Sequence, residues 1–463
     1  MNSSSTPRAD QIPIFNILLG FTVLGILLLN IQNFGTTQAN LNQLIVNPHG
    51  GNYWLMTIVN TFFGNKMVAL LSLLFGASII MFLTKSKAVN GLSVPDLYIR
   101  RQLWLMFFGL IIAIVLIWEN DVLFQYSVVG ILLSPLYRLS ARTLLIAAVL
   151  MALIFSGKSF WDFSETKEKY DKYQKVLVYE KKHKIVKPTE KQMKDTVAMK
   201  KLAKLSDEQK EDTTAWKRLA KKYKFDKKVN DEEIKSMRSG YADAWSYMLP
   251  NTQFREAAWL YRYGLWDIAS LMFLGMALFK FEFFTNIYST QKYFIIAFVG
   301  LGLGKLLAWL SLGAYELQIL DYTKYVSTSV VPLQEVLKPF ERAFSAVGWG
   351  ALVIFFYRLG TMTWLWRALA AVGQTALSNY FLQAILCILF FYGYGMGYFG
   401  LLEFYQLYFV VAEVWLLQLV FSVVWLHFYQ YGPVEWLWYS LVRWEKQPMQ
   451  RLKTIDTSSP INS

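Results

Sequence analysis

Long apolar runs separated by short polar segments recur along the whole chain. The first, "FNILLGFTVLGILLLN" over Phe15–Asn30, is apolar apart from one amide near each end. Later runs lie at 103–118, 122–133, 144–155, 268–279, 351–357 and 410–425. Several reach or approach the ~20 residues that cross ~30 Å of hydrocarbon. The pattern therefore predicts an all-α fold, a polytopic membrane helix bundle.

The apolar runs predict about ten transmembrane helices. We place them near 12–31, 67–84, 98–118, 121–137, 140–156, 263–281, 293–313, 343–358, 372–392 and 405–428. The segments 54–63 and 364–371 and the stretch "GPVEWLWYSLVRW" are expected to lie at the interface. The first run exceeds the ~7–15 residues of a signal-peptide core, and "NIQNFG" after it is a poor cleavage site, so we expect a retained first span.

Basic residues occupy alternate loops and predict an orientation. One set of loops and the C-terminal tail are basic, with Lys85, Lys87, Arg100, Arg101, Arg138, Arg142, Lys280, Lys292, Arg358, Arg367, Arg443, Lys446, Arg451 and Lys453. No basic residue occurs between Gln32 and Asn65, and the loop near 120 carries only acids. Under the positive-inside rule, both termini are expected in the cytoplasm of a bacterial cell, with the protein in the inner membrane.

Residues 157–245 interrupt the membrane pattern. They contain 24 Lys and Arg against 16 Asp and Glu, which is +8 of the net charge of +14. Capping boxes at Thr189–Gln192 and Ser206–Gln209 predict helices. We therefore divide the chain into a first membrane half (1–156), a basic helical extracytoplasmic insertion with little apolar surface (157–245) and a second membrane half (246–463). The insertion is either a solvated hairpin or a docking site for a protein partner or lipid headgroups.

Composition narrows the possible chemistry. Hydrophobic residues make up 55% of 463 and charged residues 17%, which fits a membrane protein better than a soluble one. The single cysteine, Cys387, excludes a disulfide framework. The three histidines are scattered, and no metal or nucleotide motif occurs, so we expect no metal, no cofactor and no nucleic-acid partner.

Ionisable residues inside spans are costly and often functional. Lys305 and Glu413 each lie about eight residues, or ~12 Å, from the outer end of a predicted span, so they are expected at equal depth. We expect them to pair, either as a structural salt bridge or beside a polar cavity. Lys66, Asp121 and Asp267 begin predicted spans on the same outer side. In the inner half, Asn379 and Gln383 are candidates for contacts between helices.

Several segments together resemble the YeiB-like family of bacterial inner-membrane proteins, known as domain of unknown function 418. They include "LGILLLNIQNFG", "LLSLLFGA", "IWENDVLFQYSVVG", "VGQTALSNYFLQ" and "FSVVWLHFYQYGPVEWLW". The positions that fit the family pattern are Lys66, Asp121, Asn379, Gln383, Gly432, Pro433 and Glu435. The resemblance implies a distant similarity to membrane acyltransferases and does not cover 157–245 well.

Other positions depart from that family. Asn16 and Leu18 stand where the family typically has an acid and an arginine, and Ala113 stands where it has a histidine. Arginines of the family are also replaced at Gln374 and Tyr439. A general base with a pKa near the operating pH is therefore missing from its usual place.

Three functions remain open on the sequence alone. The first is a non-catalytic relative that binds a lipid or amphiphile or serves as a subunit of an envelope complex. The second is an acyltransferase that uses another base such as Glu413, with acyl-CoA as donor. The third is a transporter or flippase with Lys305 and Glu413 on its path. Membrane lipids are expected partners in each case.

Overall fold

The computed structural model describes residues 11–89, 91–182, 205–285 and 287–450. Over these ranges the chain forms helices and no β-strand, so the expected all-α fold is confirmed. The first half comprises α1 (Gln11–Gly35), α2 (Gln38–Val46), α3 (Gly50–Phe62), α4 (Lys66–Lys85), α5 (Val94–Leu110), the π-helix η1 (Ile111–Val115), α6 (Leu123–Leu133), the 3-10 helix η2 (Ser134–Arg138) and α7 (Ala141–Lys182).

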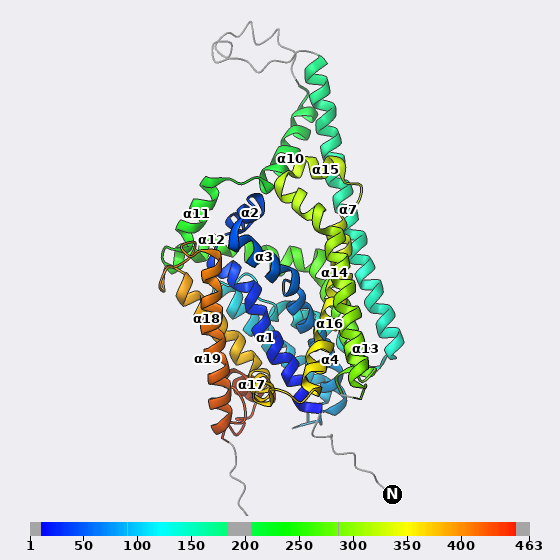
Figure 1. The fold of residues 1–463 in the computed structure, drawn as a ribbon, viewed down its shortest axis with the longest axis vertical. Coiled ribbons are helices and arrows are strands. Elements are labelled where there is room, and N and C mark those ends of the chain that lie inside the picture. The colour runs from blue at the N-terminus through cyan, green and yellow to red at the C-terminus, as the bar shows by residue number, and fades with distance from the viewer. Residues whose placement is uncertain (1–10, 90, 183–204, 286, 451–463) are drawn as a thin grey trace, which may run out of the picture.

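The remaining elements follow the insertion. They are α10 (Asp207–Tyr223), α11 (Lys227–Met237), α12 (Tyr241–Phe254), the π-helix η3 (Arg255–Gly264), α13 (Leu265–Lys280), η4 (Phe283–Thr285), α14 (Thr290–Leu320), α15 (Tyr322–Thr328), α16 (Leu333–Arg358), α17 (Thr363–Gln374), α18 (Ala376–Phe391), η5 (Phe404–Gln406), α19 (Leu407–Phe428) and α20 (Pro433–Arg443). Figure 1 shows the long helices side by side, with α7 and α10 projecting beyond one end, here called the insertion end.

Each expected span falls on a helix, but not every helix is long and apolar enough to cross a membrane. Six segments of the described chain are long and apolar enough to do so: Ile14–Gly35, Gly50–Lys85, Val94–Val115, Ala141–Lys182, Thr290–Leu320 and Phe404–Phe428. α17 and α18, bent by 84°, form a seventh candidate. α6 and α13 have only 11 and 16 residues. The chain is thus a multi-pass helical membrane protein, while the number of ten spans stays a prediction.

Three helix pairs meet through glycines that face one another. A Cβ atom on either partner would overlap the backbone of the other helix, in the pairs Gly76–Gly275 (α4 with α13), Gly20–Gly373 (α1 with α17) and Gly300–Gly348 (α14 with α16). Lipid tails are as apolar as leucine, so helices in a membrane gain stability from close van der Waals contact. Small residues at these crossings permit that contact. The segment 364–371, expected at the interface, therefore belongs to a helix that packs on α1.

Four of the basic loops meet at the opposite end of the bundle. The Lys280 amine donates a hydrogen bond to the Leu139 carbonyl oxygen, and Arg358 donates to the Tyr288 carbonyl. Arg101 lies over the Trp438 ring of α20 at 4.3 Å, and the Trp438 indole donates to the Arg101 carbonyl. The loops that carry the predicted inside charge therefore share one end, which we call the basic end.

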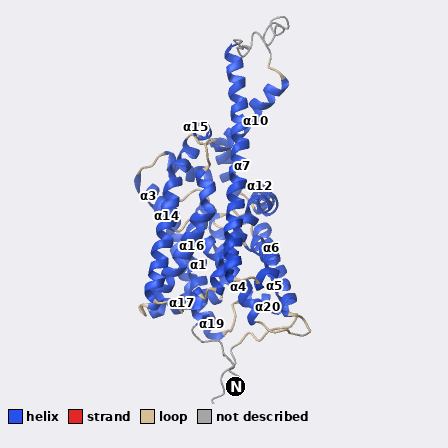
Figure 2. Cartoon of the chain, turned by 90° about the vertical axis from the view of Figure 1, so that its right-hand side faces the viewer, coloured by secondary structure: helices blue, strands red, loops and turns tan. Residues whose placement is uncertain are grey.

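α7 joins the membrane bundle to the insertion without a break. It continues through the expected boundary at 156, and its 42 residues measure ~63 Å, about twice the hydrocarbon thickness. Figure 2 shows this helix rising beyond α15 at the insertion end. The insertion is therefore a continuation of the fifth expected span.

The insertion packs on the bundle more extensively than expected. Phe163 and Trp216 bury their side chains with Tyr325 and Val326 of α15, and Met237 is 1% exposed. The expectation that the insertion has little apolar surface is wrong. Its sequence is highly charged overall, but these few large apolar side chains are enough to pack on the bundle. The Ser206–Gln209 capping box is present. The one expected at Thr189 lies outside the described residues.

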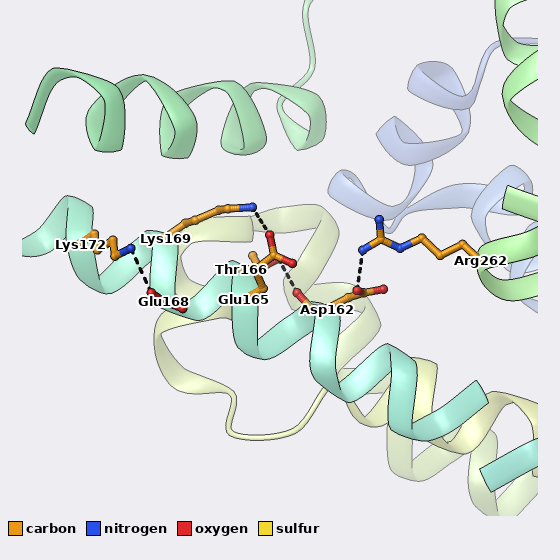
Figure 3. Close-up of polar contacts among 7 residues, drawn as sticks. All are labelled: Asp162, Glu165, Thr166, Glu168, Lys169, Lys172 and Arg262. Carbon is orange, nitrogen blue, oxygen red and sulfur yellow. Dashed lines mark hydrogen bonds and ion pairs between the residues drawn. The ribbon is translucent and has the colours of Figure 1, made fainter. Parts of the chain in front are cut away.

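The outer half of α7 carries several ion pairs (Figure 3). Lys169 and Lys172 pair with Glu165 and Glu168, each one turn earlier, and Asp162 pairs with Arg262 of η3 at 2.6 Å. Exposed pairs of the first kind contribute only about 0.3–0.5 kcal/mol each. The Arg262 contact joins α7 to η3, which leads into the site described next.

Candidate functional site

A buried ion pair links α13 and α16 near the insertion end. Arg342 Nη1 contacts Asp267 Oδ2, and the two residues are only 6% and 3% exposed. Asp267 Oδ1 and Arg342 Nε have no hydrogen-bond partner within the described residues. Both charged groups therefore keep unused hydrogen-bonding capacity, which is costly in a buried position and available to a ligand.

Lys66 forms a second ion pair with Glu341, the residue that precedes Arg342 on α16. Its amine lies 3.0 Å from Glu341 Oε1 and donates a 3.0 Å hydrogen bond to the Asn60 carbonyl oxygen at the end of α3. The Lys66 and Glu341 side chains are 10% and 15% exposed. Adjacent residues of α16 thus hold α13 on one side and α4 on the other.

Two cavities flank these ion pairs. The first, here called the wide chamber, has a volume of about 650 Å³ and is bounded by α4, α6, α7, α10, η3, α13, α14, α15 and α16. The second, the lateral chamber, has about 470 Å³ and is bounded by α1–α4, α14 and α16. Asn65, Lys338 and Arg342 line both chambers, so the two chambers adjoin at these side chains. Both volumes match those of sites for small organic ligands.

Asp121 lies at the α6 side of the wide chamber. It is fully buried, accepts hydrogen bonds from the Phe124 backbone N–H at 3.1 Å and the Tyr380 hydroxyl at 3.2 Å, and lies near Glu256. Burial and the Asp121 charge raise the pKa of Glu256, in η3, to about 8. Arg255, which lines the wide chamber, donates to Asn120 at 2.9 Å and lies over the Trp259 ring. Acidic and basic groups therefore gather at this wall.

The expected pairing of Lys305 with Glu413 is wrong. The Lys305 amine lies 4.5 Å from the centre of the Phe62 ring, and no ion pair within the described residues joins it to Glu413. Glu413 is exposed on α19 and lines neither chamber. Equal depth in the membrane does not bring the two together because α14 packs on α16, whereas α19 packs on α1, α17 and α18.

Asn379 and Glu435 make contacts between helices. Asn379 donates to Thr375 Oγ1 and Ser422 Oγ, both at 2.8 Å. Glu435 of α20 accepts hydrogen bonds from the Ser378 backbone N–H and hydroxyl, and thereby caps the start of α18. Gln383 is buried and its amide has no partner within the described residues. None of these residues lines a chamber described above.

Two of the five positions that depart from the family pattern, Leu18 and Ala113, are buried, whereas Gln374 is exposed. Leu18 is fully buried in an apolar cluster with α4 and α17 residues. Ala113 is 1% exposed and lies in the π-helix η1, and Asn16 is half-buried, with its carbonyl against Gly373. Ala113, which stands where the family typically has a histidine, is thus an apolar packing position here.

Sequence reasoning missed Glu341, Arg342 and Arg255. They lie outside the expected spans, and for Glu341 and Arg342 the reason is that the spans 293–313 and 343–358 leave 314–342 as a loop, whereas α14 continues to Leu320 and α16 begins at Leu333. Lys338, Glu341 and Arg342 recur at helical spacing in "LKPFERAF", which was the available signal for one polar helix face. No group of three His, Cys, Asp or Glu side chains suited to a metal ion occurs in the described part of the chain.

Comparisons with known proteins place the chain among uncharacterized relatives. Residues 278–445 match the family described as "Protein of unknown function (DUF418)". The chain is 24% identical to the uncharacterized protein YxaH of Bacillus subtilis over 96% of both chains. It is 27% identical to the uncharacterized protein YeiB of Escherichia coli over 91% of this chain and 94% of YeiB. No solved structure matches. The resemblance to the YeiB-like family is confirmed, while the likeness to acyltransferases stays a prediction.

Proposed function

Because this chain is a YeiB-like, DUF418-containing membrane protein, we propose that it binds a lipid or other amphiphile whose polar headgroup enters the wide chamber. The observation that carries the proposal is the buried Asp267–Arg342 pair, which lines a cavity of about 650 Å³ and leaves one atom of each side chain unpaired. A headgroup with both donors and acceptors would satisfy these atoms. Aromatic residues such as Trp259 and Tyr322 also line the chamber and suit the junction with acyl chains.

Binding is favoured over acyl transfer by the positions of the candidate bases. Glu413 is exposed and lines neither chamber, so it has no bound substrate to act on there. The family-typical histidine position is the buried Ala113. Transport along a Lys305–Glu413 path likewise loses its basis because the two residues do not pair.

Filling the wide chamber should abolish amphiphile binding. Ser159 of α7 lines the chamber and is 7% exposed, so a Ser159→Trp side chain would occupy headgroup space. We expect native mass spectrometry to find tightly retained phospholipid on the wild type and at least about tenfold less on the variant, a difference of ~1.4 kcal/mol. Gly157→Trp is the matched control, since no atom lies within 4 Å of its added Cβ. Equal retention by all three proteins would contradict the proposal.

We further propose that the protein resides in the bacterial inner membrane with the basic end and both termini in the cytoplasm. Lys87 lies at the basic end and Lys222 in the insertion, and both are exposed. A cysteine at position 222 should react with an impermeant maleimide on intact spheroplasts, whereas one at position 87 should react only after lysis. The native Cys387 is buried and supplies little background. Labelling of both positions on intact cells would refute this orientation.

The insertion is the proposed docking site for a protein partner. Trp216 packs inward, while Lys217, Lys221 and Lys222 of the same helix remain exposed at the insertion end. This basic surface suits an acidic partner in an envelope complex.

A further inference from the structure

Two lysine ammonium groups approach the C-terminal end of α3 from different helices. The Lys66 amine of α4 is hydrogen-bonded to the Asn60 carbonyl oxygen and paired with Glu341. The Lys305 amine of α14 is shielded from solvent, lies against the Phe62 ring, and has no hydrogen-bond partner within the described residues. The Lys66 and Lys305 charges are close enough to repel one another. Lys305 is thus a buried cation without a hydrogen-bond acceptor among the described residues.

Lys305 lies one turn before the first residue of α14 that lines the lateral chamber. Ala308, Leu312 and Tyr315 follow it at three, seven and ten residues along α14, and all three line that chamber. These spacings place the four side chains on one helix face. Lys66 and Glu341 line the same chamber from the opposite wall. Lys66 therefore borders the lateral chamber directly, whereas the Lys305 amine lies behind the chamber lining, within electrostatic reach of Lys66 and Glu341.

The surroundings of Lys66 carry an excess of positive charge. Lys66 and Lys305 face a single carboxylate, Glu341. The other two basic residues that line the chamber are paired with different carboxylates: Lys338 lies 3.7 Å from Glu335, and Arg342 pairs with Asp267. Glu316 also lines the chamber but is eleven residues from Lys305 along α14, ~16 Å away.

We propose that the lateral chamber binds a phosphate group at Lys66, and that the Lys305 side chain turns toward this phosphate. A buried ammonium without acceptors is unfavourable, and a second cation nearby increases the cost. A phosphate offsets both because its several oxygens accept charge-assisted hydrogen bonds from lysines that approach from separate helices. The inference rests on the proposed function and deepens it: the amphiphile carries a phosphate, which binds in the lateral chamber, next to the wide chamber at Arg342.

The test compares matched ligands on purified, delipidated protein in a neutral detergent. Binding of dihexanoyl phosphatidic acid, dihexanoylglycerol and inorganic phosphate is measured by calorimetry for the wild type, Lys305→Met and Lys292→Met. We expect the wild type to prefer the phosphatidic acid over the glyceride at least about tenfold, as one strong charge-assisted contact provides. Lys305→Met should reduce this preference to less than about threefold. Lys292→Met, exposed at the other end of α14, should retain it.

A thermal readout separates a lost ligand contact from a lost fold. Lys305→Met removes a buried charge without a partner, so without ligand its melting temperature should equal or exceed that of the wild type. Phosphatidic acid should then raise the wild-type melting temperature and leave that of the variant unchanged. Lys305→Arg, which keeps the charge, should recover part of the preference.

The remaining outcomes distinguish failure of the phosphate site from failure of the proposed amphiphile binding. Binding of both lipids without preference, or an undiminished preference in Lys305→Met, overturns the phosphate site and leaves amphiphile binding standing. Binding of inorganic phosphate as tightly as phosphatidic acid, lost in Lys305→Met, supports the anion site and contradicts the amphiphile. Binding of none of the three ligands overturns both.

Discussion

Replacing Arg342 with methionine should destabilise the protein by about 3–5 kcal/mol, the usual cost of breaking a buried ion pair by removing one partner. The substitution leaves the Asp267 carboxylate buried between α13 and α16 with no cation beside it. The measurement is the loss of folded, monodisperse protein on heating in detergent. Asp267→Leu should give a similar loss, because the Arg342 guanidinium then lacks its acid.

The double variant Asp267→Leu with Arg342→Met distinguishes an ion pair from two independent contributions. It should recover much of the loss, since no unpaired charge remains. Simple addition of the two single effects would show that the side chains do not act as a pair. In the double variant we also expect weaker amphiphile binding despite recovered stability, because both groups line the wide chamber.

Replacing Gly275 with leucine should prevent α4 and α13 from packing at their present distance. A Cβ at this position overlaps the Leu73 carbonyl group, which is backbone and cannot rotate away. We expect a loss of about 3 kcal/mol or more, at the upper end of overpacking effects, seen as aggregation or a lower melting temperature in detergent.

Gly302→Leu on α14 is the matched control for Gly275→Leu. Its added Cβ has no atom within 4 Å, and the position is exposed on the bundle surface. The same glycine-to-leucine change should therefore be tolerated. Equal loss at both positions would mean that glycine itself, rather than the close helix crossing, is required.

Several features of the molecule were predictable because they depend on local sequence alone. The apolar runs predicted helices at every expected span, and Ser206 and Gln209 predicted a helix start that is present. The basic positions near Arg101, Lys280 and Arg358 do lie at one end of the bundle. Hydropathy, capping and loop charge act over one element, so their signals are contained in that element.

The partners of the buried charges depended on the tertiary structure. Depth along a helix gives one coordinate, and it placed Lys305 level with Glu413. It gives neither the rotation of a helix nor its neighbours, and these are decided by glycine crossings such as Gly300–Gly348, which pack α14 on α16. Lys66 and Asp267 were therefore identifiable as costly charges from the sequence, whereas Glu341 and Arg342 became their partners only because helices distant in the chain pack side by side.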